Sequence, residues 1–175
     1  FVVLGGEIDL STGMASTFAG CNAALMVTRM GMNTYAAILV AVLVGSIIGT
    51  LTGCIVTYLK IPAFIGSLGV QYVIQGLILI TTNSMPINGL PENFLFLGRG
   101  YLADVIPVPV VIMAILFVIG AVLLRYTTFG RSVIAVGENQ EAAKLSGLNV
   151  NRTKVLIFTI GGFCAALAGV VQAAR

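Results

Sequence analysis

The chain has 175 residues, of which 58% are hydrophobic and 9% are charged, with a net charge of +3. A soluble domain carries about 25% charged residues, so this composition excludes an ordinary water-facing surface. The scattered basic residues give no sign of nucleic-acid binding. The chain has no histidine and no C-x-x-C spacing, and its three cysteines lie within apolar runs, which argues against a metal site or a disulfide framework.

Five uncharged runs predict membrane-spanning helices. About 20 apolar residues cross the hydrocarbon core as a helix, which satisfies its own backbone polar groups there. The sequence therefore predicts an all-α, polytopic transmembrane helix bundle of about five to six spans, because residues 1–4 resemble the tail of an earlier span. Since the chain begins without Met, we expect residues 1–175 to be the transmembrane domain of a larger permease-like protein. The runs are 10–28, 30–59, 61–91, 105–124 and 155–174.

Residues 5–11 (GGEIDLS) precede the first of these runs. Asp9 is predicted to cap a helix that begins at Leu10, after two glycines that loosen the backbone. Acidic residues beside an apolar run are costly unless they lie at an interface or in a wet cavity. Two interpretations stay open: an interfacial N-cap, or a broken helix that lines a solute pathway with Asp9 and Ser11.

Small and polar residues within the runs indicate how the helices pack. Two sets with a spacing of four residues predict closely packed helix faces: Gly45, Gly49 and Gly53, and Gly161, Ala165 and Gly169.

Uncharged amides suit a neutral polyhydroxylated solute better than an ion. Gln71 and Gln75 share one helix face, and together with Asn83, Asp9 and Ser11 they are the candidate translocation residues. Hydrogen bonding between helices is the alternative role for them.

Basic residues orient the runs in the membrane. The turn around Lys60 and the loop 125–154 contain six Lys and Arg, whereas the two other connections contain only Arg29 and Arg99. The positive-inside bias places the first pair of connections in the cytoplasm. On the opposite side, residues 81–107 are predicted to be a turn-rich connector that dips into the membrane or docks an external partner.

A short helix is predicted within the cytoplasmic loop, over residues 139–147. Asn139 is a good N-cap and Gly147 a good C-terminal stop. Two helical turns are unstable alone in water, so the helix must pack against something. The slender Ala142 and Ala143 favour a groove on a partner protein. The alternative, a helix that rests on lipid headgroups, requires a larger apolar face. Glu141 and Lys144, three residues apart, could pair with each other or with the partner.

Several strings in the sequence resemble those of a known family. Glu141-Ala142-Ala143 followed by Gly147 resembles the "EAA…G" motif of membrane subunits of ATP-binding-cassette importers. Thr159-Ile160 replaces the usual Leu-Pro, which points away from the maltose-type branch. Four longer strings resemble sugar permeases of the ribose/xylose/galactose type, in the superfamily that also holds branched-chain amino-acid permeases. They are GGEIDLSTG (5–13), IPAFIGSLG (61–69), TTNSMPI (81–87) and FGRSVIAVGENQEAAKLSGLNV (129–150).

The resemblance implies a bacterial inner-membrane subunit that forms the pathway for a monosaccharide or similar polar solute. It also implies a second permease copy or homologue, an extracellular or periplasmic solute-binding protein, and ATPase subunits that bind ATP and receive the helix 139–147. This chain has no G-x-x-x-x-G-K-[ST] loop, so we expect it to hold no cofactor of its own. The residues implied in ATPase coupling are Asn139, Glu141, Ala142, Ala143, Lys144 and Gly147.

Other functions fit the residues less well. A branched-chain amino-acid or nucleoside permease of the same superfamily stays open. A secondary transporter would normally show paired ionisable residues inside its spans, and apart from Glu7 and Asp9 these runs have none. A non-transporting scaffold leaves the amides and the capped helix unexplained. An enzyme is disfavoured because the chain lacks His, a nucleophile–base pair and metal ligands.

Overall fold

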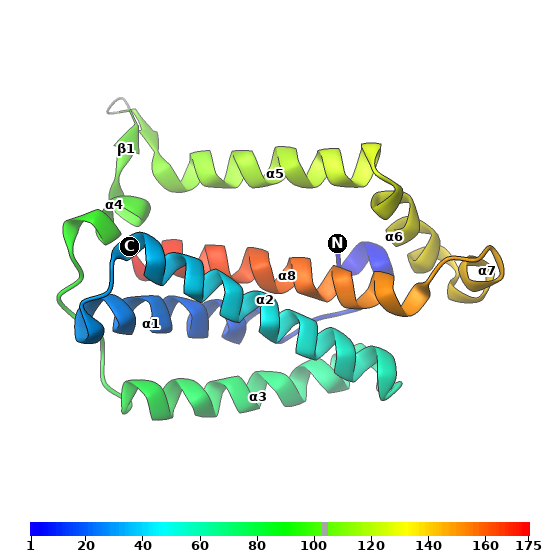
Figure 1. The fold of residues 1–175 in the computed structure, drawn as a ribbon, viewed down its shortest axis with the longest axis horizontal. Helices are drawn as coiled ribbons and strands as arrows, with labels where there is room; N and C mark the ends of the chain where they lie inside the picture. Colours follow the sequence, from blue (N-terminus) through cyan, green and yellow to red (C-terminus); the bar gives the residue numbers. More distant parts are fainter. Residues whose placement is uncertain (103–104) are drawn as a thin grey trace.

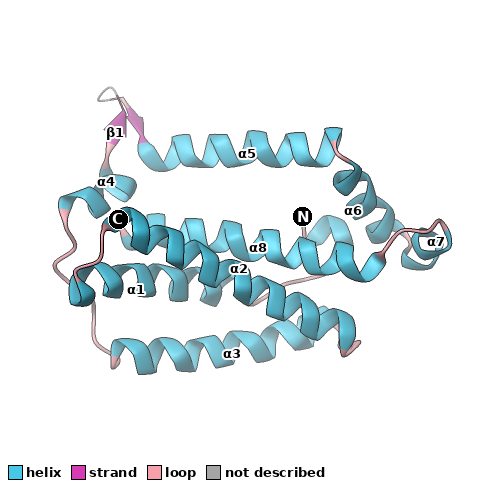
Figure 2. Cartoon of the chain, in the orientation of Figure 1, coloured by secondary structure: helices cyan, strands magenta, loops and turns pink. Residues whose placement is uncertain are grey.

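The computed structural model describes residues 1–102 and 105–175 as a bundle of long helices (Figures 1 and 2). A short 3-10 helix (η1) precedes the bundle, and two antiparallel strands of two residues each precede α5. The elements are η1 (Val3–Gly5), α1 (Thr12–Met30), α2 (Thr34–Tyr58), α3 (Ala63–Thr82), α4 (Glu92–Arg99), β1 (Tyr101–Leu102), β2 (Ile106–Pro107), α5 (Val108–Tyr126), α6 (Thr128–Glu138), α7 (Gln140–Leu145) and α8 (Val150–Ala173).

All five predicted runs are helical, as α1, α2, α3, α5 and α8, and the predicted all-α polytopic bundle is confirmed. Four of them, α2, α3, α5 and α8, are long and apolar enough to cross a membrane. α1 has 19 residues, and Gly, Ser, Thr and Asn make up a larger share of it than of the other four. The chain is therefore a multi-pass membrane protein.

α8 is the central helix of the bundle. It packs along both α1 and α2, while α3 packs against α1 and α2 on the other side. α5 makes its main contacts with α4, α6 and β2. The α2–α3 turn, η1, α6 and α7 lie at one end, which we call the α7 end, and α4 lies at the opposite end (Figure 1). The charge pattern assigns Lys60 and residues 125–154 to the same side of the membrane. In the structure, both lie at the α7 end.

Glycines allow α2 and α8 to approach backbone to backbone. A methyl group at Gly49 would clash with the carbonyl oxygen of Phe158 and with Gly162, and one at Gly45 would clash with Ala166. Gly53 faces α8 in the same way. The predicted close-packing face of α2 is therefore confirmed.

The predicted close-packing face of α8 is correct at Gly169 and wrong at Gly161. α8 presents Gly162 and Ala166 to α2, whereas Gly161 lies against Val2. Gly169 faces α1, where a methyl group on Gly169 would clash with the carbonyl oxygen of Ser16. The physical reason is that α8 lies between two helices and uses a different set of small residues for each. A single spacing of four residues describes only one face.

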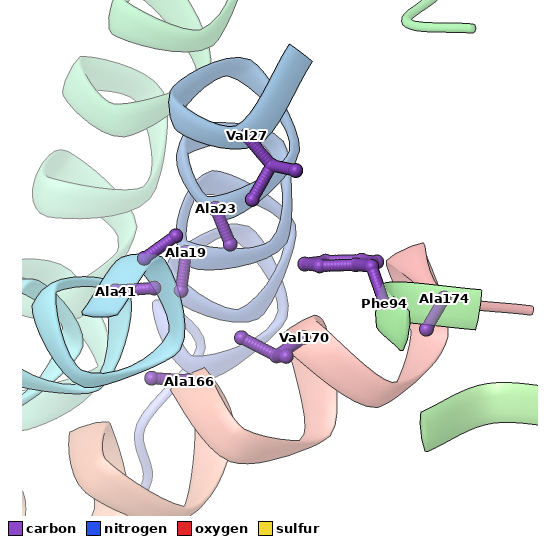
Figure 3. Close-up of a cluster of buried hydrophobic side chains, with 9 residues drawn as sticks. Ala19, Ala23, Val27, Ala41, Phe94, Ala166, Val170 and Ala174 are labelled. Atoms are coloured by element: carbon purple, nitrogen blue, oxygen red, sulfur yellow. The ribbon is translucent and has the colours of Figure 1, made fainter. Parts of the chain in front are cut away.

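The end of the bundle opposite α7 is filled by Phe94 of α4. This ring is fully buried among small side chains of α1, α2 and α8 (Figure 3). The stretch 81–107, predicted to be a turn-rich connector, thus contains an eight-residue helix that was missed. Its signals were available: Pro91 directly precedes it, Glu92 occupies its first turn and Arg99 its last.

We predict that Gly49→Ala destabilises the bundle by about 1–3 kcal/mol, because overpacking forces α2 and α8 apart. Thermal unfolding in detergent measures the change. Gly76→Ala in α3 is the matched control, since a methyl group there meets nothing within 4 Å. An unchanged unfolding temperature for Gly49→Ala would contradict the close contact of α2 with α8.

Candidate functional site

The N-terminus of α7 is capped by Asn139, as predicted. The Oδ1 atom of Asn139 accepts hydrogen bonds from the backbone N–H groups of Glu141 and Ala142, each at 3.0 Å. These bonds satisfy two of the N–H groups that a helix start leaves without a partner. α7 therefore begins at Gln140, at a fixed place after α6.

The C-terminus of α7 ends at a glycine turn, also as predicted. Gly147 has φ of +81°, a conformation that costs glycine little. The N–H of Leu148 then donates to the carbonyl oxygen of Ala143 at 3.1 Å, which closes the last turn. Asn149 starts α8 by accepting from the N–H of Arg152. Both ends of α7 are thus fixed by side chains and turns in its own sequence.

The side chains of α7 divide into an inner and an outer set. Ala143 is buried within the chain, with 4% of its surface exposed, so it supports α7 from inside and is not part of the exposed surface. Glu141, Ala142 and Lys144 are exposed. Leu145 is 89% exposed, although it is the largest apolar side chain of the helix. Leu145 thus points away from the rest of the chain and is accessible to another molecule.

A second helix lies in the region predicted as a loop. α6 occupies Thr128–Glu138 and buries Val133 and Val136. The hydroxyl of Thr127 caps it by accepting from the N–H of Gly130 at 3.2 Å. The region 125–154 is therefore helical over most of its length, and α7 is held between α6 and α8. The signal that could have revealed α6 is the threonine cap followed by apolar residues at a helical spacing.

The chain before α1 is not helical and lies against α3. The backbone N–H of Leu10 donates to the Ser67 hydroxyl of α3 at 3.1 Å. Asp9 accepts from both the N–H and the hydroxyl of Ser11, at 2.8 and 2.6 Å. The prediction that Asp9 caps a helix starting at Leu10 is wrong. The Asp9 carboxylate instead accepts from Ser11, two residues further along the chain, in a turn, and α1 begins only at Thr12.

Glu7 forms an ion pair that the sequence did not predict. Its carboxylate lies 2.5 Å from the ammonium group of Lys154 in α8, and the two side chains are 13% and 14% exposed. Within residues 1–102 and 105–175 it is the only ion pair. Lys154 was counted with the basic residues of the cytoplasmic side, and no local pattern connects it to an acid so far away in the sequence.

The candidate translocation residues lie in three places. Asp9 and Ser11 are in contact at the start of α1. Gln71, half-buried, and Gln75, exposed, follow Ser67 by one and two turns of α3, on the edge that Ser67 presents to the start of α1. Asn83 ends α3 at the other end of the bundle, with φ of +53°. Four of the five residues thus belong to neighbouring elements, and Asn83 does not join them.

Comparisons with known proteins show the family of the chain. A family model described as "Branched-chain amino acid transport system / permease component" matches residues 1–175. The chain is 40% identical to the ribose import permease protein of Bacillus subtilis over 177 residues, covering all of this chain and 54% of that protein.

Two further relatives have lower sequence identity. The ribose import permease protein of Haemophilus influenzae is 38% identical, with all of this chain and 55% of that protein covered. The xylose transport system permease protein of the same organism is 28% identical, with all of this chain and 63% of that protein covered. The chain spans about half the length of the ribose permeases that it matches.

No solved structure matches the chain. The family model covers it from end to end, and the ribose permeases match it over its whole length. The capped α7, the interrupted start of α1 and the closely packed α8 are therefore features of a chain that belongs to the family of branched-chain amino acid transport system permease components.

Proposed function

We propose that this chain belongs to the transmembrane subunit of an ATP-driven importer that moves a monosaccharide or a similar polar solute across the bacterial inner membrane. The observation that carries the proposal is α7: a six-residue helix fixed at both ends, with its last residue, Leu145, exposed. Because α6 and α8 already support α7 through the buried Ala143, the exposed side chains of α7 are free to meet a partner. Relatives named as ribose and xylose permeases support a sugar as the solute.

The partner of α7 is proposed to be an ATPase subunit. The chain carries no phosphate-binding loop, so the nucleotide would bind to a separate polypeptide and this chain would not itself be an enzyme. A second permease copy or homologue and an external solute-binding protein complete the proposed assembly, with lipid around the apolar helices. Glu141, Ala142 and Leu145 would contact the ATPase, with Ala143 holding α7 in place from inside.

α8 offers the route from the ATPase to the solute pathway. It begins four residues after Ser146, at Val150, and then packs against α1 and α2 through backbone contacts. Close-packed helices transmit displacement because their interfaces do not compress. Movement of α7 would therefore reach α1, and with it Asp9 and Ser11 in the non-helical residues directly before α1. Gln71 and Gln75 would contribute uncharged hydrogen-bonding groups from α3.

A branched-chain amino-acid permease is the second candidate, because the matching family model carries that description. An amino acid has a charged carboxylate and a charged ammonium group, whereas a sugar offers only hydroxyls. The ligand of the solute-binding protein that co-purifies with the full-length chain distinguishes the two. A bound sugar supports the first candidate, and a bound aliphatic amino acid supports the second.

We predict that Leu145→Ser weakens ATPase binding about tenfold, as loss of a central apolar anchor does at other protein interfaces. The bundle should keep its unfolding temperature, since the side chain is exposed. Co-purification of the ATPase measures the effect. Leu59→Ser is the matched control, because Leu59 is 65% exposed at the same end but outside α7. Equal losses for the two variants would show that docking does not depend on α7.

We predict that Asn139→Ala also weakens ATPase binding, through loss of α7 rather than loss of a contact. Removing an N-cap costs about 0.5–2 kcal/mol, which is enough to unfold a six-residue helix locally. Hydrogen exchange of the α7 amides should speed up while α8 amides stay protected. Asn139→Asp, which keeps a capping oxygen, should restore both properties. Unchanged exchange in Asn139→Ala would refute the role of this cap.

We predict that Gln71→Ala and Gln75→Ala each lower uptake about fivefold, because a lost hydrogen bond to the solute costs about 1 kcal/mol. Co-purification of the ATPase should be unaffected. Gln172→Ala, an exposed amide near the end of α8, is the control and should transport normally. If uptake and assembly fall together, the amides serve helix packing and not solute binding.

A further inference from the structure

The first seven residues, which we call the N-terminal segment, lie between α6 and α8 at the α7 end (Figure 1). η1 within this segment packs mainly on α6. Gly5 is buried, and a Cβ there would lie 2.7 Å from Cδ1 of Ile157 in α8. The N-terminal segment therefore fills the angle between the helix that leads into α7 and the helix that leaves it.

The contact with α6 is made by backbone alone. A methyl group at Gly137 would clash with the carbonyl oxygen of Leu4, and Gly6 faces the carbonyl oxygen of Gly137 in return. Gly137 is the second-last residue of α6, two positions before the α7 cap at Asn139. A backbone contact has no side chain that can change rotamer, so displacement of the end of α6 displaces the N-terminal segment too.

The contact with α8 combines apolar packing with charge. Glu7, the last residue of the N-terminal segment, pairs with Lys154 in the second turn of α8. Both side chains are largely withdrawn from solvent, where an ion pair is screened less than at the surface. Lys60 of the α2–α3 turn and Gln140 of α7 line the same polar pocket as the pair. The ion pair thus lies where α7, α8 and the N-terminal segment meet.

The N-terminal segment continues directly into the non-helical residues that precede α1. Two residues after Glu7, the Asp9 carboxylate holds Ser11, and the N–H of Leu10 is bonded to Ser67 of α3. The four residues from Glu7 to Leu10 are non-helical, and a short non-helical connection transmits a pull along its length because it has little slack. A shift of Lys154 would therefore act on the candidate translocation residues at the start of α1.

We propose that Glu7 and Lys154 are positioning residues that tie the α7 end of α8 to the interrupted start of α1. Motion received at α7 then reaches Asp9 and Ser11 by a second route, through the N-terminal segment, besides the packing of α8 on α1. This inference rests on the proposed function, since it assigns the pair a part in coupling ATP hydrolysis to solute movement. The alternative role of the pair is stability alone.

The test uses the full-length complex with its ATPase and solute-binding protein in proteoliposomes. Glu7→Gln and Lys154→Gln each leave one charge without its partner. Uptake per ATP hydrolysed should fall roughly tenfold, within the range of typical coupling energies, while the ATPase still co-purifies and still hydrolyses ATP. The exchange Glu7→Lys with Lys154→Glu should recover coupling. Arg152→Gln is the control, because this neighbour on α8 has the same charge and is exposed.

A second variant tests the backbone contact without changing charge. Gly137→Ala should push the N-terminal segment from α6 and lower uptake per ATP in the same way, whereas Gly76→Ala should not. Normal coupling in both single charge variants overturns the proposal. So does a loss of uptake matched by equal losses of ATPase binding and thermal stability, because that result assigns the pair a structural role. If the unaltered chain shows no ATP-dependent uptake, the proposed function fails first, and the inference fails with it.

Discussion

Direct backbone contact between helices is the constraint on which the rest of this structure depends. In lipid the apolar side chains gain nothing by leaving the solvent, so helices associate where small residues let their backbones approach. α8 does this twice, against α2 at Gly49 and Gly162 and against α1 at Gly169 and Ser16. Its position is therefore set along almost its whole length. α7 precedes α8 directly, and so the same glycines that hold the bundle together also fix where α7 lies.

Close packing of this kind separates the parts that must move together from those that need not. α1, α2 and α8 form one closely packed unit, and the fully buried Phe94 closes it at the end opposite α7. α5 is joined to this unit mainly through α4, α6 and β2. A displacement at α7 would therefore act on both α6 and α8, and would reach α5 through α6. The division follows from residue size, since α5 carries Leu, Ile, Val and Phe along its length where α8 and α1 carry Gly and Ala at their contacts.

The sequence predicted features that depend on neighbouring residues and missed those that depend on distant ones. The apolar runs, the Asn139 cap and the Gly147 stop are local, and the structure confirms them. α4 and α6 are short helices within stretches whose turn-forming or charged residues predict connections between spans. The partner face of α8 and the pairing of Glu7 with Lys154 require knowledge of which helices meet. No spacing within one segment contains that information.

The interruption before α1 shows why such long-range pairs matter. A continuous helix would satisfy its own backbone groups and could shift without regard to its neighbours. Residues 6–11 are not helical, and two of their polar groups bond to neighbouring helices: Leu10 to Ser67 of α3, and Glu7 to Lys154 of α8. The start of α1 is consequently attached to two helices at once. When those helices move relative to each other, the non-helical residues before α1 must change these hydrogen bonds and this ion pair. The helices themselves keep their internal hydrogen bonds.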